Sequence, residues 1–289
     1  MTDTGKASER DSAPVRVLRP QHRTSRFIFA SPHSGRSYPP AFLARSALPL
    51  ALLRRSEDAY VEAFFTSAPA LGASLIAAEF PRALVDPNRD AWEFDPTMFE
   101  DALPANAGPA SARAAAGLGV VPRLAADGRA IYAGKLAFAE ARERIRRYYR
   151  PYHDTLKAEI DAVREQFGEA IVIDCHSMPS ASARGADIVL GDRFGASCTR
   201  ALTTRAEAGF RRLGLSVVRN RPYAGGFTTE HYGAPDSGVH VLQVEINRGL
   251  YLDEARVCPG EGWDDLAARL ERWMQDIVGF QEISEAAAE

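Results

Sequence analysis

The sequence predicts an α/β protein in which helices flank a mixed, mostly parallel central sheet in three layers. Short apolar runs rich in β-branched residues recur along the chain, and amphipathic stretches of helical length lie between several of them. Strands that alternate with helices are typical of layered folds with a largely parallel sheet. Strands are expected at residues 26–31, 74–80, 170–176, 187–190, 215–219 and 239–246.

The helices are predicted from amphipathic spacing and from the residues that interrupt it. Gly72 and Gly168 each end an amphipathic stretch, and Pro151 should kink the longest one because proline cannot donate a backbone hydrogen bond. Helices are therefore expected within 48–72, which forms one or two of them, and within 137–168, 195–214 and 263–281.

The chain is expected to form one domain behind a flexible arm. Residues 1–20 are polar and are predicted to be the arm, and residues 21–280 are predicted to be the domain. The stretch 104–128 is rich in alanine, glycine and proline, and no second set of strands follows it. We interpret it as a long insertion or lid within the domain rather than as a linker.

The composition is that of a soluble globular protein. Hydrophobic residues make up 46% of the chain, charged residues 25%, and the formal net charge is -3, so neither a nucleic-acid surface nor an acidic tail is expected. No apolar run approaches the roughly 20 residues that cross a bilayer, and the start lacks the apolar core of a secretory signal. The cysteines at 175, 198 and 258 have no CxxC spacing, which argues against a disulfide framework and favours the reducing cytoplasm.

Polar residues at strand ends are the first candidates for a site, because open α/β sheets bind ligands at the carboxyl ends of their strands. The segment SPHSG follows the first predicted strand. Pro32 favours an extended Ser31 and Gly35 permits a sharp turn, so His33 is presented at the strand end. Taken alone, the pattern is more typical of a histidine that is hydrogen-bonded within a loop.

A second polar group ends the run AIVIDCHSMPS. Alternation along a strand places Asp174 and His176 on one side and Cys175 on the other, which argues against a thiol–imidazole pair. An acid two residues from a histidine commonly orients a metal-binding imidazole, although Asp174 could also contribute directly. The alternative is a polar strand terminus.

A third polar group lies inside the apolar run VHVLQVEINRGLY, where Glu245 shares a face with Gln243 and Asn247. An unpaired carboxylate buried there would cost several kcal/mol. Glu245 must therefore be paired, bound to a metal or at a cleft, unless this is an edge strand with one solvated face.

These residue types are those of a zinc hydrolase. Zinc often binds two histidines and one carboxylate, and it lowers the pKa of water in its open position to about 7. His33 and His176 are the candidate ligands, and Glu245 is the candidate general base. The third ligand is expected to be Asp58, on an otherwise apolar helical face, with Glu57 and Asp174 as the alternatives.

Two further segments are candidates for substrate contact. Arg82, Asn88 and Arg89 fall within eight positions around the apolar ALV, and arginine suits carboxylate recognition, although surface ion pairs are the common alternative. The adjacent glycines of NRPYAGGFTTEHYG predict a loop that approaches a ligand closely, or else an ordinary tight turn. The chain contains no GxxxxGK[ST] motif, no GxGxxG motif that opens a helix, and no GxSxG motif.

Together these motifs resemble those of the N-formylglutamate amidohydrolase family, and they follow its order from residue 31 to 251. The segments are SPHSG…YP (31–39), SEDAYVEAFF (56–65), PRALVDPNR (81–89), GLGVVPR…IY (117–132), YYRPYH (148–153), IDCHSMPS (173–180), NRPYAGGFTTEHYG (220–233) and LQVEINRGLY (242–251).

The resemblance implies a zinc-dependent hydrolase with a carboxypeptidase-like α/β fold. Family members release formate from N-formyl-L-glutamate and leave glutamate, often late in histidine degradation. The resemblance implies that His33, Asp58 and His176 hold one zinc or similar divalent ion and that Glu245 is the general base. The residues implied in substrate binding are Arg82, Asn88, Arg89, Asn220, Tyr223, Gly225 and Gly226.

Three rival functions stay open at this point: metal-dependent hydrolysis of a different amide, ligand binding without turnover, and an amidase with Cys175 as its nucleophile. The substrate could be another N-acyl amino acid, or a cell-wall or peptide amide. The protein could also be a relative that binds its ligand without turnover, although His33, His176 and Glu245 are all present. A small-molecule partner is expected in each case, with no nucleic acid and no membrane.

Overall fold

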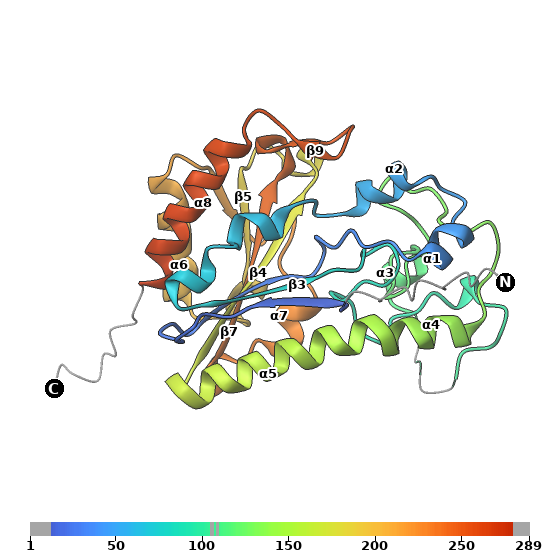
Figure 1. Cartoon of the computed structure of the whole chain (residues 1–289), viewed down its shortest axis with the longest axis horizontal. Coiled ribbons are helices and arrows are strands. Elements are labelled where there is room, and N and C mark those ends of the chain that lie inside the picture. Colours follow the sequence, from blue (N-terminus) through green and yellow to red (C-terminus); the bar gives the residue numbers. More distant parts are fainter. Residues whose placement is uncertain (1–12, 105–106, 108–109, 280–289) are drawn as a thin grey trace, which may run out of the picture.

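A seven-stranded sheet forms the centre of the protein, with helices on both faces (Figure 1). The structure is a computed structural model that describes residues 13–104, 107 and 110–279. The strands of this sheet are β1 (Val15–Leu18), β2 (Phe27–Ser31), β3 (Ser74–Ala78), β4 (Ala170–Met178), β5 (Ile188–Gly191), β6 (Val217–Arg219) and β7 (Val239–Asn247), and a small hairpin pairs β8 (Leu252–Asp253) with β9 (Cys258–Pro259).

The strand order is β1-β3-β2-β4-β7-β5-β6. The central strands β3, β2, β4 and β7 are parallel, whereas β1 and the β5–β6 pair run in the opposite direction at the two edges. The predicted mixed, mostly parallel sheet is therefore confirmed, and the six predicted strands are present with ends shifted by at most two residues. The parallel strands bring their carboxyl ends to one edge, where the site lies.

The first strand corrects the predicted arm. Residues Val15–Leu18 pair antiparallel with β3 and extend the sheet, so the arm cannot reach residue 20. These residues are only partly buried and include an arginine, which is why the short run lacks a clear strand pattern. Residues 1–12, which make up most of the predicted arm, lie outside the described residues.

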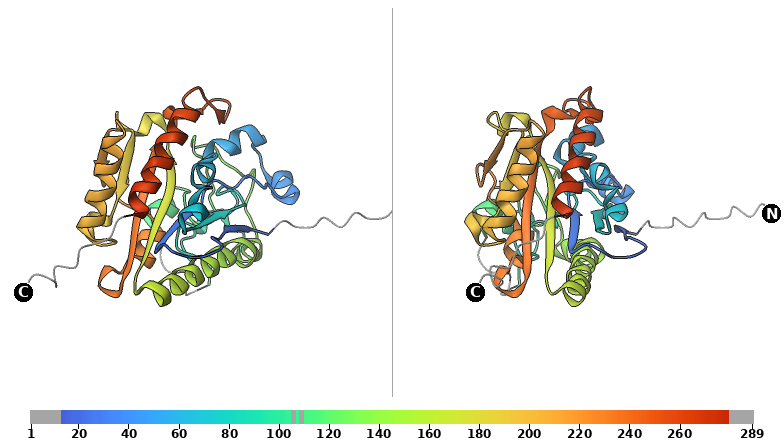
Figure 2. Two further views of the ribbon diagram at one scale, coloured as in Figure 1. Left: turned by 60° about the vertical axis from the view of Figure 1, so that its left-hand side comes forward. Right: turned by 90° about the vertical axis from the view of Figure 1, so that its left-hand side faces the viewer.

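The helices are α1 (Pro40–Arg45), α2 (Leu50–Leu53), α3 (Ala112–Ala115), α4 (Phe138–Arg144), α5 (Arg150–Phe167), α6 (Arg200–Arg212), α7 (Phe227–Tyr232) and α8 (Trp263–Val278). Figure 2 shows α6 and α8 on one face of the sheet and α5 on the other, which gives the predicted three layers. Alternate strand residues fill two separate cores. Phe27 and Phe29 pack on the side of α6 and α8, whereas Ile28 and Ala30 pack on the side of α5.

The stretch 48–72 differs from its prediction. It forms the four-residue α2 and three 3-10 turns at Arg54–Ser56, Val61–Phe65 and Ala68–Leu71, and it ends at Gly72 as expected. Glu57 is extended and Tyr60 has a left-handed φ of 64°, so the turns do not merge into a continuous helix. Asp58 therefore does not lie on a helical face. Its backbone N–H donates instead to the carbonyl of His33 at 3.0 Å.

The long helix predicted over 137–168 is present as α4, a π-helical turn over Ile145–Tyr149, and α5, which ends at Gly168 with a φ of 80°. The wider turn ends two residues before Pro151, whose ring would clash with a carbonyl of the preceding turn in a regular helix. Across the described parts of the chain, no helix is both long and apolar enough to cross a membrane.

Candidate active site

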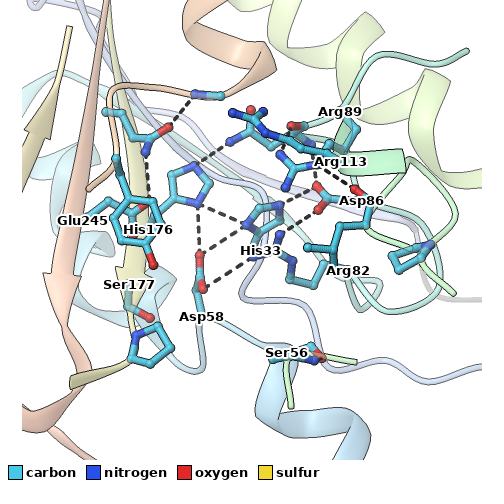
Figure 3. Close-up of a pocket in the computed structure, with 18 of the residues that line it drawn as sticks. His33, Ser56, Asp58, Arg82, Asp86, Arg89, Arg113, His176, Ser177 and Glu245 are labelled. Atoms are coloured by element: carbon cyan, nitrogen blue, oxygen red, sulfur yellow. Dashed lines mark hydrogen bonds and ion pairs between the residues drawn. The ribbon is translucent and has the colours of Figure 1, made fainter. Parts of the chain in front are cut away.

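Three buried side chains from distant parts of the sequence meet at the carboxyl edge of the sheet (Figure 3). His33 follows β2, Asp58 lies between two 3-10 turns, and His176 is in β4. The Nδ1 atoms of the histidines are 3.1 Å apart, and Oδ2 of Asp58 lies 3.3 Å from that of His33 and 3.0 Å from that of His176. Two nitrogens and one oxygen thus face a common point, as the predicted ligand set requires.

The turn that carries His33 depends on Gly35. A Cβ at this position would lie 2.2 Å from the carbonyl oxygen of Phe80, so no larger residue fits beside the chain that leaves β3. The close approach brings the turn after β2 against the segment after β3, which carries Asp86.

The far side of the His33 ring contacts Asp86. The Nε2–H of His33 donates to Oδ1 of Asp86 at 2.7 Å, and the backbone N–H of Asn88 donates to the same oxygen at 2.8 Å. A proton on Nε2 leaves the lone pair of Nδ1 directed toward Asp58. This is the tautomer that a metal ligand needs.

The ring of His176 is oriented by Asp174. The Nε2 atom lies 3.0 Å from Oδ2 of Asp174 and 3.2 Å from Nδ2 of Asn88. Asp174 is fully buried, and its oxygens have no aligned hydrogen-bond donor among the described residues. A proton on Nε2 that faces this carboxylate compensates its buried charge, and it also leaves Nδ1 available at the common point.

Asp58 is held as an anion. Nη2 of Arg248 donates to its Oδ1 at 2.9 Å, which leaves Oδ2 toward the histidines. Burial alone would raise its pKa, but when no cation is bound, protonated Nδ1 atoms of His176 and His33 donate to it, and these bonds, together with the charges of His33 and Arg248, lower the pKa well below its usual value. Conversely, burial opposes protonation of His176, but Asp174 and Asp58 raise its pKa well above the usual value. The centre therefore favours positive charge, which a divalent cation would supply.

The two alternatives for the third ligand point elsewhere. Glu57 accepts hydrogen bonds from Tyr38 at 2.9 Å and from Arg54 at 3.2 Å, and Asp174 lies behind His176. Buried donors of two nitrogens and one carboxylate oxygen match the set that zinc accepts. The residues present therefore fit such an ion, and the structure places Asp58 with the two histidines.

Glu245 lies beside this centre on β7. The parallel register pairs it with His176, and its side chain is 6% exposed. Nε2 of Gln243 donates to Oε1 of Glu245 at 2.8 Å. Burial raises its pKa to about 7, with a further increase from Asp58, while His176 and two arginines act in the opposite direction. A carboxyl group that titrates near neutrality can both accept and return a proton.

The cavity around these residues has a volume of about 550 Å³. Figure 3 shows Glu245, His176 and Ser177 on one side of it and the arginines at 82, 89 and 113 on the other. Of the residues implied in substrate binding, the lining includes Arg82, Asn88, Arg89, Tyr223, Gly225 and Gly226. It also includes residues that the sequence analysis did not single out, among them Arg113, Gln243 and Arg248.

Two of the lining residues are already engaged by the protein. Nη2 of Arg82 donates to Asp86 at 2.7 Å. Asn88 accepts hydrogen bonds from the backbone and hydroxyl of Thr228 at 2.8 and 3.1 Å. A Cβ at Gly226 would lie 2.4 Å from Nδ2 of Asn88, so the predicted close approach of the glycine loop is to protein atoms. These residues shape the site.

The prediction for Asn220 needs correction, because this residue is not part of the cavity lining. Its Nδ2 donates to Asp192 at 2.7 Å, and its Oδ1 accepts from the backbone N–H of Asp192 at 3.1 Å. Its φ of 59° is left-handed, a conformation that asparagine tolerates better than most residues. Asn220 thus stabilises the turn at 192–194.

His153, in the segment YYRPYH, supports the site from behind. Its Nε2–H donates to the carbonyl of Pro87 at 2.8 Å, and the hydroxyl of Tyr232 donates to its Nδ1 at 2.9 Å. Burial lowers its pKa to about 4, so the ring is neutral near pH 7 and can donate at one nitrogen while it accepts at the other. Pro87 lies between Asp86 and Asn88, and His153 therefore holds the loop that contacts both His33 and His176.

Cys175 lies on the opposite face of β4 from His176, as alternation predicts. Its side chain is fully buried in the core beneath α6 and α8, and burial raises the pKa of its thiol well above the usual value. A neutral thiol in that position is no nucleophile for the cavity.

Comparison with known proteins agrees with this geometry. The profile of the family described as N-formylglutamate amidohydrolase matches residues 25–252. An N-formylglutamate deformylase of Pseudomonas putida is 34% identical over 205 residues, which cover 68% of this chain and 71% of that protein. One from Pseudomonas aeruginosa is 33% identical over 236 residues, which cover 78% and 82%.

Solved structures agree as well. The crystal structure of N-formylglutamate amidohydrolase from Ralstonia eutropha JMP134 superposes with a TM-score of 0.87 at 33% identity and covers 92% of this chain and 97% of that one. The gene product Atu2144 of Agrobacterium tumefaciens shares the fold, with a TM-score of 0.65 at 20% identity over 92% of this chain and 94% of that one. This chain belongs to the N-formylglutamate amidohydrolase family.

Proposed function

We propose that this protein is a metal-dependent amide hydrolase that removes formate from N-formyl-L-glutamate and leaves L-glutamate. The observation that carries the proposal is the convergence of His33, Asp58 and His176 beside Glu245 in one cavity. The names of the deformylases from the two Pseudomonas species support the choice of substrate.

Nδ1 of His33, Nδ1 of His176 and Oδ2 of Asp58 would hold the ion, and zinc is the proposed metal. When bound, such an ion polarises a carbonyl oxygen and makes a water molecule more acidic. Asp86 and Asp174 would hold the histidine rings in the required tautomer, and Arg248 would hold the carboxylate of Asp58.

Glu245 supplies the proton transfer. Gln243 donates to one of its oxygens, so the other oxygen is the one that accepts a proton from the attacking water. The same carboxyl group then returns that proton to the nitrogen of the departing glutamate, whose bond to the formyl carbon breaks. Its raised pKa of about 7 suits both steps, because neither protonation state is strongly favoured at neutral pH.

A second substrate class is favoured by the size of the cavity. A volume of about 550 Å³ lies within the range of roughly 300–1,000 Å³ that drug-sized ligands occupy. N-formyl-L-glutamate is smaller than such ligands, so an N-acyl amino acid with a longer acyl group would also fit. The predicted cytoplasmic location and role in histidine degradation stay part of the proposal.

The test compares three amides with purified protein loaded with zinc. N-formyl-L-glutamate should be hydrolysed with release of formate, and faster than N-acetyl-L-glutamate or a small cell-wall peptide. A chelator should abolish the reaction, and added zinc should restore it. Faster hydrolysis of either competitor would replace the proposed substrate, and no hydrolysis of any amide would indicate a relative that only binds its ligand.

A further inference from the structure

Four arginines line the cavity, and they differ in their partners. Arg82 donates to Asp86, and Arg248 donates to Asp58. Each of these two cations is therefore neutralised by a carboxylate that belongs to the metal centre. The other two, Arg89 and Arg113, have no ion pair with a carboxylate among the residues that the structure describes.

Arg89 is held in place by neutral groups. Its Nε donates to the carbonyl of Leu118 at 3.1 Å, and its Nη1 donates to the carbonyl of Asn88 at 3.0 Å. These bonds leave Nη2 without a described partner. Burial lowers the pKa of Arg89, and the charges of Arg82 and Arg113 lower it further, while Asp86 raises it. Asp86 is nearby but is already bonded to Arg82 and His33, so Arg89 has no carboxylate of its own among the described residues.

Arg113 lies on α3, within the segment 104–128 that we interpreted as an insertion or lid. Its side chain is exposed and reaches the same wall as Arg89, on the Asp86 side of the cavity (Figure 3). Its backbone carbonyl accepts a hydrogen bond from the N–H of Leu118 at 2.9 Å. Leu118 thus contacts both arginines, through its N–H on one side and its carbonyl on the other, and sets their relative position.

Two neighbouring cations repel each other unless an anion lies between them or each has its own. Arg113 also lines a shallow outer hollow with Trp92 and Glu230, so it lies on the outer side of this wall. Arg89 lines the cavity together with Asn88 and His176 and is not part of the outer hollow, so it lies on the inner side. An amino acid with two carboxylates would place one on each arginine.

We propose that Arg89 and Arg113 form a two-cation subsite that selects N-acyl amino acids with an acidic side chain. Arg89 binds the carboxylate nearer the scissile amide, and Arg113 binds the side-chain carboxylate. This inference rests on the proposed function. It makes α3 an element of substrate selection, with Arg113 as its specificity-determining residue.

The experiment compares N-formyl-L-glutamate with N-formyl-L-glutamine, which has nearly the same shape but lacks the second charge. In the unaltered protein, kcat/KM should be about 100-fold or more higher for the glutamate compound, because a site that is built to pair a charged group rejects the analogue without it. Arg113→Gln should lower kcat/KM for the glutamate compound by about 30-fold or more, mainly through KM, and change that for the glutamine compound by less than about 3-fold.

Two matched variants separate selection from general charge and from folding. Arg113→Lys keeps the charge without the planar fork and should lose less than Arg113→Gln. Arg129→Gln removes a positive charge from an exposed arginine that forms an ion pair with Asp127 and does not line the cavity, and it should behave as the unaltered protein. Equal losses for both formyl compounds, or an equal loss in Arg129→Gln, would overturn the proposal.

A binding measurement makes the result independent of turnover. Calorimetry on the zinc-loaded protein should show tighter binding of L-glutamate than of L-glutamine, and Arg113→Gln should remove that difference. If neither formyl compound is hydrolysed, the proposed function fails, and the calorimetric comparison still decides the subsite. If both are hydrolysed and neither measurement distinguishes the two side chains, the subsite fails and the proposed function stands.

Discussion

The two halves of the site are built in different ways. His176 and Glu245 are paired across adjacent parallel strands, so their spacing follows from the register of β4 and β7. Asp58, Asp86 and Arg89 lie on irregular segments, and hydrogen bonds with other segments hold each of them in place. The strand-borne half obtains its precision from the sheet itself, whereas the loop-borne half depends on side-chain partners that can be removed one at a time.

The largest effect is expected in the strand-borne half. Glu245→Gln should lower kcat by about 10²–10⁴-fold, the usual contribution of general acid–base catalysis, because the amide cannot accept a proton. Zinc retention, measured by metal analysis after dialysis, should stay that of the unaltered protein, because Glu245 is not one of the three residues that converge on the proposed ion. An unimpaired rate would remove Glu245 from the chemistry.

The next effect tests the loop-borne half. Loss of a residue that only hydrogen-bonds to a metal ligand typically weakens metal affinity by about 10–100-fold. Asp58→Asn should weaken zinc affinity by more than that, because the charged carboxylate that would bind the ion directly is lost. Glu57→Gln is the matched control, since it changes the neighbouring buried acid that contacts Tyr38 and Arg54. Competition with a chromophoric chelator measures both variants. Equal zinc affinity in Asp58→Asn and the unaltered protein would show that another acid is the ligand.

The smallest effect concerns His153, which supports the loop-borne half from a distance. Its folded-state pKa of about 4 lies below the ordinary 6.5, so the unfolded chain binds the proton more readily. The contribution of the neutral ring to stability is therefore present above about pH 6.5 and is lost as the pH falls toward 4. The full shift corresponds to about 3 kcal/mol.

Urea unfolding of the unaltered protein and of His153→Gln at several pH values tests this expectation. The difference in unfolding free energy between the two proteins should shrink as the pH falls from about 6.5 to 4, and KM should rise only a few-fold in the variant. A difference that does not change with pH would show that His153 does not titrate with folding. Loss of zinc would place its role nearer the metal centre than the structure indicates.

Periodicity explains why much of the fold could be predicted. The parallel strands are buried on both faces, so they form continuous apolar runs that stand out from their surroundings. Alternation along β4 also predicted that Asp174 and His176 share a face and that Cys175 lies on the other, which the structure buries in the core. The edge strand β1 was not predicted, because it is short and only partly buried and therefore forms no continuous apolar run.

The sequence by itself determined the layered architecture, the strand ends that carry His33 and His176, and the inward-facing Glu245. These follow from local periodicity and from backbone preferences of proline and glycine. The tertiary structure alone decided that Asp58 leaves the expected helix to meet the histidines, that Asn220 stabilises a turn, and that Arg113 reaches the cavity. Each of these depends on contacts between residues that are far apart in the chain, and a contact of that kind leaves no periodic pattern in the sequence.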